Sequence, residues 1–184
     1  QNAFEGRHTS TGERSMLGAF QEVGRAMIDQ PLGTLATFDL MYAGVEGVVK
    51  TSAKQAIITA ERQIGDRDPF AVRVLKALFL VKYVEEFKPT VRNVAILMQD
   101  QLDLDPTQHK RRVEGALALL EQESYVQRNG DRYEFLTDEE KDIEQKIKAT
   151  SLDTSDVTGE LADMLFGEIM GNRKSIKHET SGET

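Results

Sequence analysis

The chain has 184 residues, of which 39% are hydrophobic and 29% are charged, the composition of an ordinary globular protein. No apolar run approaches the length of about 18 residues that a transmembrane helix needs. Cysteine is absent, which excludes disulfides and thiolate metal sites and fits a cytoplasmic location. The first residues lack both an initiating methionine and the pattern of a signal peptide, so we expect a fragment of a longer chain.

The net charge of −8 is unevenly distributed. Residues 68–136 carry 10 Lys and Arg against 11 Asp and Glu, whereas residues 137–184 carry 6 against 12. The centre is therefore almost neutral. It lacks the broad basic excess that drives strong non-specific binding to DNA.

Residues 1–67 are predicted to form a helical connector. Apolar periodicity predicts a helix over residues 16–28, whose apolar face holds Leu17, Phe20, Val23 and Met27. Two further helices are expected over residues 38–49 and 53–64, and Gly44 and Gly47 weaken the first of them.

Residues 68–136 carry sharper signals. Asp68-Pro69 and Asp105-Pro106 each combine a helix-capping side chain with a proline suited to the first turn. They predict helices to about Phe87 and about Glu123, and Thr90 is expected to cap a third helix between them, to about Gln101. The first helix is apolar over most of its circumference, which is typical of a central helix covered by its neighbours.

The segment from Tyr125 to Leu136 predicts a β-hairpin. Asn129-Gly130 favours a two-residue turn, which pairs Val126 with Tyr133 and places Phe135 on the same inward face. Three helices followed by a hairpin is the order of a winged helix-turn-helix domain. The expected fold class is therefore mainly α, with a helical lid or connector before this domain and further helices after it.

Residues 137–172 are predicted to hold the C-terminal helices. Thr137 and Glu140 have the spacing of a capping box for a helix to about Lys148. An amphipathic helix is expected over residues 157–170, and a disordered tail over residues 173–184.

No catalytic, cofactor or metal site is expected. His8, His109 and His178 lie far apart, no pair has helical metal-ligand spacing, and each is expected to lie at the surface. No glycine-rich loop precedes a Lys-Ser/Thr pair, so this chain does not provide a phosphate-binding loop. We expect the chain not to be an enzyme by itself.

The helix over residues 105–123 has two competing interpretations. As a recognition helix it would bring basic and amide side chains to the major groove, supplemented by the wing. Those candidates for DNA contact are Gln108, Lys110, Arg111, Arg112, Arg128 and Arg132. As a protein interface it would use its small or apolar outward positions Gly115, Ala118 and Leu119. The glutamates on the same helix favour the protein interface, and DNA contact remains the alternative.

Three segments resemble the P-loop ATPases of the bacteriophage exclusion (BREX) systems, the BrxC/PglY family. They are residues 12–23, residues 68–84 and the wing with the following helix start, residues 127–142. The resemblance extends over about residues 12–170.

This resemblance implies a large parent ATPase of a bacterial antiviral defence system, using ATP and magnesium bound by Walker motifs outside the chain. It implies other BREX subunits or a second copy as partners, with DNA possible and no membrane. The expected role is a non-catalytic docking module that couples the motor to its partners, and direct binding to duplex DNA is the alternative.

Overall fold

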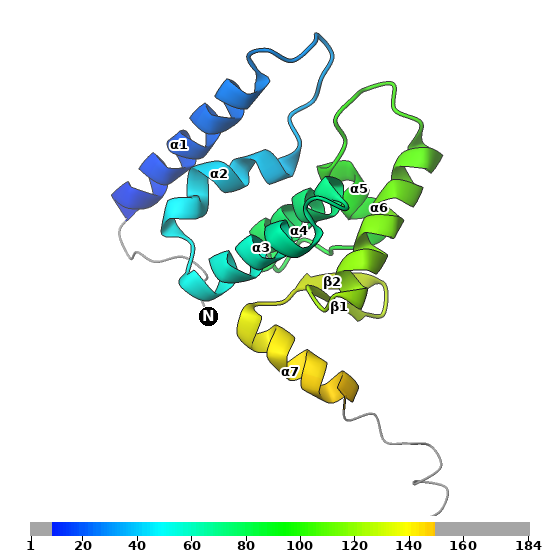
Figure 1. Cartoon of the computed structure of the whole chain (residues 1–184). Coiled ribbons are helices and arrows are strands. Elements are labelled where there is room, and N and C mark those ends of the chain that lie inside the picture. The colour runs from blue at the N-terminus through cyan, green and yellow to red at the C-terminus, as the bar shows by residue number, and fades with distance from the viewer. Residues whose placement is uncertain (1–8, 150–184) are drawn as a thin grey trace, which may run out of the picture. The chain divides into compact units, whose positions relative to one another are not determined.

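The computed structural model describes the backbone of residues 9–149 and the side chains of residues 16–147. The chain is mainly helical with one two-stranded antiparallel hairpin (Figure 1). In order, the elements are α1 (Thr9–Met27), η1 (Phe38–Leu40), α2 (Met41–Val45), η2 (Glu46–Val48), α3 (Thr51–Ile64), α4 (Pro69–Val81), α5 (Val91–Leu97), α6 (Pro106–Gln122), β1 (Val126–Asn129), β2 (Arg132–Phe135) and α7 (Asp138–Ala149). The described residues up to Gln145 form one compact unit. The helix expected over residues 157–170 and the expected tail lie outside the described residues.

Helix α4 lies at the centre of the core, as its apolar sequence predicted. Nine of its 13 residues are buried, and it packs against α3, α5, α6 and β2. The ring of Phe79 lies 5.9 Å from that of Tyr42 in α2 and 5.3 Å from that of Phe135 in β2. One side chain therefore joins the N-terminal helices to the hairpin, and the core extends continuously from Tyr42 to Phe135.

The four helix starts with a predicted capping residue are confirmed by their capping hydrogen bonds. The Asp68 carboxylate accepts from the Ala71 N–H at 3.0 Å, and the Asp105 carboxylate accepts from the Thr107 N–H at 2.8 Å. Thr90 Oγ accepts from the Asn93 N–H at 3.3 Å. The capping box at α7 also forms, because the Thr137 N–H donates to the Glu140 carboxylate at 2.8 Å and the Glu140 N–H donates back to Thr137 Oγ at 3.4 Å.

The prediction that the helix of Asp68 continues to Phe87 was wrong. α4 ends at Val81, and the chain continues through turns in which the Val84 N–H donates to the Val81 carbonyl. An extended stretch follows, where the Tyr133 N–H donates to the Pro89 carbonyl at 3.0 Å and Thr90 forms an isolated antiparallel bridge to Arg132. A helix continued through Phe87 would carry the chain past the hairpin, so this pairing requires the earlier stop.

The hairpin forms, but its predicted register was wrong. Val126 pairs with Phe135, because the two-residue turn is Gly130-Asp131 and not Asn129-Gly130. Gly130 has a φ of 65°, and a positive φ at the first central residue alone is the pattern of a type II′ turn. The shift is two residues, so every side chain keeps its face, and the inward face of Val126, Tyr133 and Phe135 is confirmed by their burial.

The junction between α6 and β1 is a Schellman motif built without glycine. The Tyr125 N–H donates to the Leu120 carbonyl, and the Ser124 N–H donates to the Glu121 carbonyl. Ser124 takes the left-handed conformation, with a φ of 58°. Position 124 is usually glycine in this motif, because a Cβ strains the left-handed backbone.

Half of the predicted apolar face of α1 is exposed, while Val23 and Met27 are half-buried. Leu17 and Phe20 are 61% and 57% exposed, and α1 instead meets α2 through the buried Ala19. The helix predicted over residues 38–49 is divided into η1, α2 and η2. Gly44 lies in α2, where a Cβ would come within 2.1 Å of Ala19 Cα. The glycine is therefore needed for the close approach of the two helices.

We expect Gly44→Ala to separate α1 from α2 and to lower the free energy of unfolding by about 1–3 kcal/mol, the usual cost of overpacking. Urea denaturation followed by circular dichroism measures this change. Gly24→Ala in α1 is the matched control, since nothing lies within 4 Å of a Cβ there. The control should leave the protein unchanged or stabilise it by up to about 1 kcal/mol. Equal effects of the two variants would contradict the role of Gly44.

Candidate interaction surface

Helix α6 is fixed to the core by its predicted inward face. Val113, Ala116, Leu117 and Leu120 are all buried. Hydrogen bonds to the Asp105 carboxylate satisfy the amides of its first turn, and Pro106 occupies the first helical position. The opposite face of α6 is open along its length. The outward side chains of this helix are therefore held at defined positions on a rigid element.

His109 is part of this fixation, and the prediction that it lies at the surface was wrong. Its side chain is only 8% exposed and lines the contact with α5. The Nε2 atom lies 2.8 Å from the Ala95 carbonyl oxygen, and the ring lies 6.4 Å from that of Phe70. A hydrogen bond from the His109 ring to the Ala95 carbonyl therefore links α6 to α5. His8 and His178 lie outside the described residues.

Half of the side chains predicted to contact DNA are engaged within the fold. The Arg112 guanidinium lies over the Phe70 ring, 4.0 Å from its centroid. Lys110 Nζ lies 3.6 Å from the Glu114 carboxylate on the same helix. In the hairpin, Arg128 Nε donates to the Gly130 carbonyl at 3.0 Å. The contacts of Arg112 and Arg128 hold these two side chains against the protein, whereas the exposed pair of Lys110 with Glu114 is weak and leaves its ammonium group accessible.

The other half of the predicted DNA-contact set remains available. Gln108 and Arg111 are exposed near the start of α6, and Arg132 is exposed in β2. No hydrogen bond or ion pair of their side chains occurs within the described part of the chain. These three side chains are therefore accessible to a ligand without loss of a contact within the described residues.

The predicted protein-interface positions lie together on the outer face of α6. Gly115 and Ala118 are exposed, and a Cβ on Gly115 would have nothing within 4 Å. Leu119 is half-buried and packs against the core, so it forms the inner edge of this strip. We call Arg111, Gly115 and Ala118 with Leu119 the outer strip of α6.

Lys82 anchors the base of the hairpin. Its Nζ donates to the Phe135 carbonyl at 2.8 Å and to the Glu140 carboxylate, which ties α4 to β2 and α7. Burial alone raises the pKa of Glu140, but the hydrogen bonds from Lys82 and Thr137 and the charge of Lys82 outweigh it. The pKa of Glu140 is therefore lower than its ordinary value.

A groove lies between α5 and the start of α6, and the sequence did not predict it. It has a volume of about 340 Å³ and is lined mainly by the aliphatic residues Ala95, Ile96, Leu104 and Pro106. Ile96 is 60% exposed although the apolar face of α5 points to the core. The sequence does contain one indication of the groove. Ile96 is apolar but does not share the helix face of Val94 and Met98, so it points away from the core.

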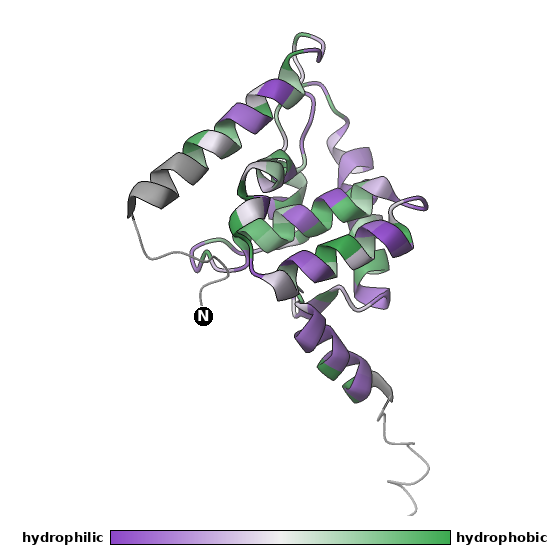
Figure 2. Ribbon diagram, turned by 60° about the vertical axis from the view of Figure 1, so that its left-hand side comes forward, coloured by the Kyte–Doolittle hydropathy of each residue, from purple (hydrophilic) through white to green (hydrophobic). Residues whose placement is uncertain are grey.

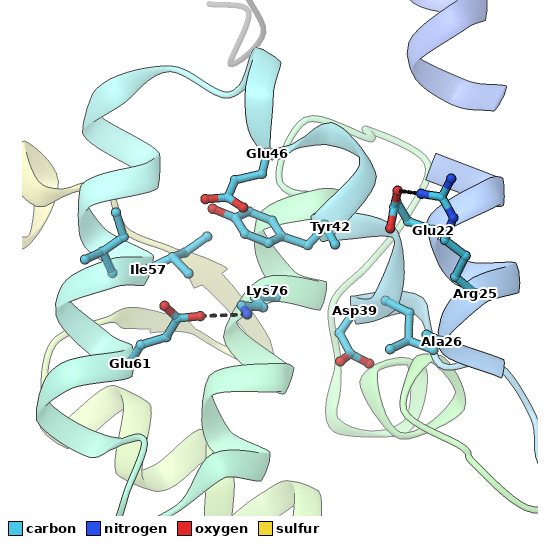
Figure 3. Close-up of a pocket in the computed structure, with 12 residues that line it drawn as sticks. Glu22, Arg25, Ala26, Asp39, Tyr42, Glu46, Ile57, Glu61 and Lys76 are labelled. Carbon is cyan, nitrogen blue, oxygen red and sulfur yellow. Dashed lines mark hydrogen bonds and ion pairs between the residues drawn. The ribbon is translucent and has the colours of Figure 1, made fainter. Parts of the chain in front are cut away.

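A second cavity, of about 550 Å³, lies among α1, α2, α3 and α4 (Figure 3). Tyr42, Glu46 and Glu61 point toward it, and burial, with the nearby charges of Glu46 and Glu61, raises the pKa of Tyr42. Its carboxylates are paired within the protein: Glu61 with Lys76 at 2.7 Å, Glu46 with Lys54 at 3.0 Å, Asp39 with Arg73 at 2.9 Å, and Glu22 with Arg25. The charges around this cavity are therefore nearly balanced, and no excess positive or negative charge is left to attract an ionic ligand.

Among the described side chains, those of residues 16–147, no group of three or more His, Asp or Glu could hold a metal ion. None of the helices in this same part of the chain combines the length and the apolar composition that crossing a bilayer requires. No protein-family model matches the chain, and no solved structure matches it significantly.

The pH dependence of folding should report on Glu140. A carboxyl whose pKa is lower in the folded state stabilises the fold above its unfolded pKa, and this contribution is lost as the pH falls through the folded pKa. The difference in unfolding free energy between wild type and Glu140→Gln should therefore be largest near pH 7 and shrink below about pH 4.3. The Glu140 side chain is 46% exposed, so screening limits this contribution to about 1 kcal/mol.

Urea denaturation at several pH values measures this difference, with Glu139→Gln as the control on the neighbouring exposed carboxyl. A difference that stays constant from pH 7 to pH 3 would assign the effect to packing and not to the charge of Glu140.

Proposed function

We propose that α4, α5, α6 and the hairpin form a winged helix-turn-helix domain that serves as a non-catalytic docking module for protein partners. The order of elements supports the winged helix, and so does the pairing of residues 89 and 90 with β2. In a winged helix, an extended stretch between the first two helices adds to the hairpin in this way. The turn between α5 and α6 takes the place of the helix-turn-helix connection.

The observation that carries the docking role is that two of the candidate DNA-contact arginines, Arg112 and Arg128, make contacts within the protein. A helix that reads DNA needs its cations free to meet bases and phosphates. Arg112 lies over the Phe70 ring, and Arg128 donates to the Gly130 carbonyl at the hairpin turn. A near-neutral surface with these contacts suits short-range packing better than long-range attraction to a polyanion.

The outer strip supports the same proposal. Gly115 and Ala118 have small side chains, so another backbone can approach α6 closely at these positions. Arg111 at one end adds a side chain that is enriched at protein interfaces. Close approach with one anchoring arginine is suited to a partner helix or strand packed along α6.

Duplex DNA binding is the second candidate, and a specific observation favours it. Gln108, Arg111 and Arg132 are exposed, and Arg and Gln side chains can recognise base edges in the major groove. Three such contacts are few for tight binding, since each neutralised phosphate contributes separately to affinity.

We further propose that the parent protein is a BREX-type ATPase, which rests on the resemblance of three segments of the sequence. The partner would then be another BREX subunit or a second copy of the chain. ATP and magnesium would be bound by other parts of the parent. A Walker A loop encoded upstream in the same reading frame is the simplest support for this assignment.

The docking role is tested by Ala118→Glu in the parent protein. We expect the charge to weaken association with BREX subunits, or self-association, at least tenfold, which is about 1.4 kcal/mol. Co-purification and analytical ultracentrifugation measure the two forms of association. Ala26→Glu, at an exposed alanine of α1, is the matched control and should associate as wild type does. Unchanged association of Ala118→Glu, with intact circular dichroism, would rule out this strip as the interface.

The DNA alternative is tested by replacing Lys110, Arg111 and Arg112 together with alanine. If docking to protein is the function, duplex binding should be undetectable at about 50 mM salt in both wild type and variant. Fluorescence anisotropy with a labelled duplex measures binding. The charge-matched control replaces Arg25, Lys54 and Arg62. Binding that falls steeply with salt, and that only the first triple variant loses, would establish the DNA alternative.

A further inference from the structure

We propose that the groove between α5 and α6 binds an acidic amphipathic segment of a protein partner. An aliphatic side chain of that segment enters the groove, and its carboxylates meet Arg92 and Lys110. This site is separate from the outer strip of α6 and does not depend on it.

The lining of the groove determines the apolar part of the ligand. Ala95 and Ile96 come from α5, and Leu104 and Pro106 come from the connection and the first turn of α6. Its volume of about 340 Å³ is at the lower end of the range of about 300–1,000 Å³ for ligand pockets. This size suits one or two side chains of a peptide. Ile96 remains 60% exposed and would leave water when such a side chain enters.

The polar groups of the groove are otherwise satisfied. Nε2 of His109 lies 2.8 Å from the Ala95 carbonyl, which closes the floor. Gln99 Nε2 donates to the Gln101 carbonyl at 3.0 Å. The Asp105 carboxylate is bound to the Thr107 and Gln108 amides and is thereby directed to its own helix. The groove therefore selects a ligand by its apolar side chain and by the charges at the rim.

The charges at the rim determine the rest of the ligand. Arg92 and Lys110 both line the groove and are exposed, and the described residues that line it include no carboxylate. Arg92 makes no ion pair within the described residues. Lys110 has only the surface contact with Glu114 at 3.6 Å, and exposed pairs of this kind are weak. Two cations beside an aliphatic groove are complementary to carboxylates beside an aliphatic side chain.

This combination argues against a nucleic acid as the occupant. Phosphates would meet Arg92 and Lys110 but leave the aliphatic lining uncovered, and Ile96 would remain in water. A protein segment with alternating aliphatic and acidic residues satisfies both features. Recognition of an amphipathic segment through a few apolar anchors is a common mode of docking.

The proposal is tested with two synthetic peptides of equal length that share their leucine positions and differ only in Glu or Lys at the flanking positions. Each is titrated into the isotopically labelled full chain and followed by amide NMR spectra. We expect the Glu peptide to shift the amides of residues 92–99 and 104–110 and to bind at least tenfold more tightly than the Lys peptide. Its affinity should fall as salt is raised.

Two variants and one control complete the test. Ile96→Asp and Arg92→Glu should each weaken the Glu peptide at least tenfold, and Arg92→Glu should improve binding of the Lys peptide. Ile143→Asp is closely matched, because Ile143 is 59% exposed on α7, and it should bind as wild type does. Since Arg92 is a surface residue, its variant remains informative if Ile96→Asp fails to fold.

Three outcomes would overturn the proposal. The first is equal binding of the two peptides, and the second is a set of shifted amides that lies away from α5 and the start of α6. The third is a duplex DNA that shifts the groove amides when the Glu peptide does not. The outer strip is tested separately by the association of Ala118→Glu. If the Glu peptide binds the groove and Ala118→Glu associates normally, the groove is supported and the outer strip is rejected. The two proposals can therefore fail independently.

Discussion

The structure depends on the burial of α4. Nine of its 13 residues are removed from water, so elements that precede it and elements that follow it in the chain must pack around it. The Phe79 ring of α4 contacts both Tyr42, which precedes α4, and Phe135, which lies well after it in the chain. Closely packed interiors transmit changes at such a position to all of their neighbours. The connector expected over residues 1–67 and the region expected over residues 68–136 thus share one hydrophobic core.

That shared core also determines which surfaces remain open. The apolar face of α6 packs against α4, so the outward positions of α6 hold small and polar residues. α5 is short and turns Val94 and Met98 inward, which leaves Ile96 beside the first turn of α6. Figure 2 shows hydrophobic positions concentrated in the central helices and mainly hydrophilic positions along α7, the last helix before the grey trace. The outer strip and the groove are consequences of where the neighbouring helices had to pack.

Electrostatics in this protein acts mostly over short distances. Arg73 pairs with the buried Asp39, Lys76 with Glu61, and Lys82 with Glu140, so the cations on α4 and at its C-cap are neutralised by neighbouring elements. These pairs orient side chains more than they add stability, since most of them are partly exposed. A surface whose charges are balanced locally has little long-range field for steering a polyanion. Recognition then depends on shape and on a few free cations such as Arg92 and Arg111.

The sequence alone determined the features that local interactions control. The caps at Asp68, Thr90, Asp105 and Thr137 follow from hydrogen bonds two or three residues away, and the central position of α4 follows from its composition. Only the tertiary structure decided where α4 ends, which turn the hairpin uses, and that His109 is buried against Ala95. Each of these depends on a contact with a segment distant in the sequence, such as Pro89 with Tyr133. The groove was not predictable for the same reason, because it exists only where the side chains of two separately specified helices meet.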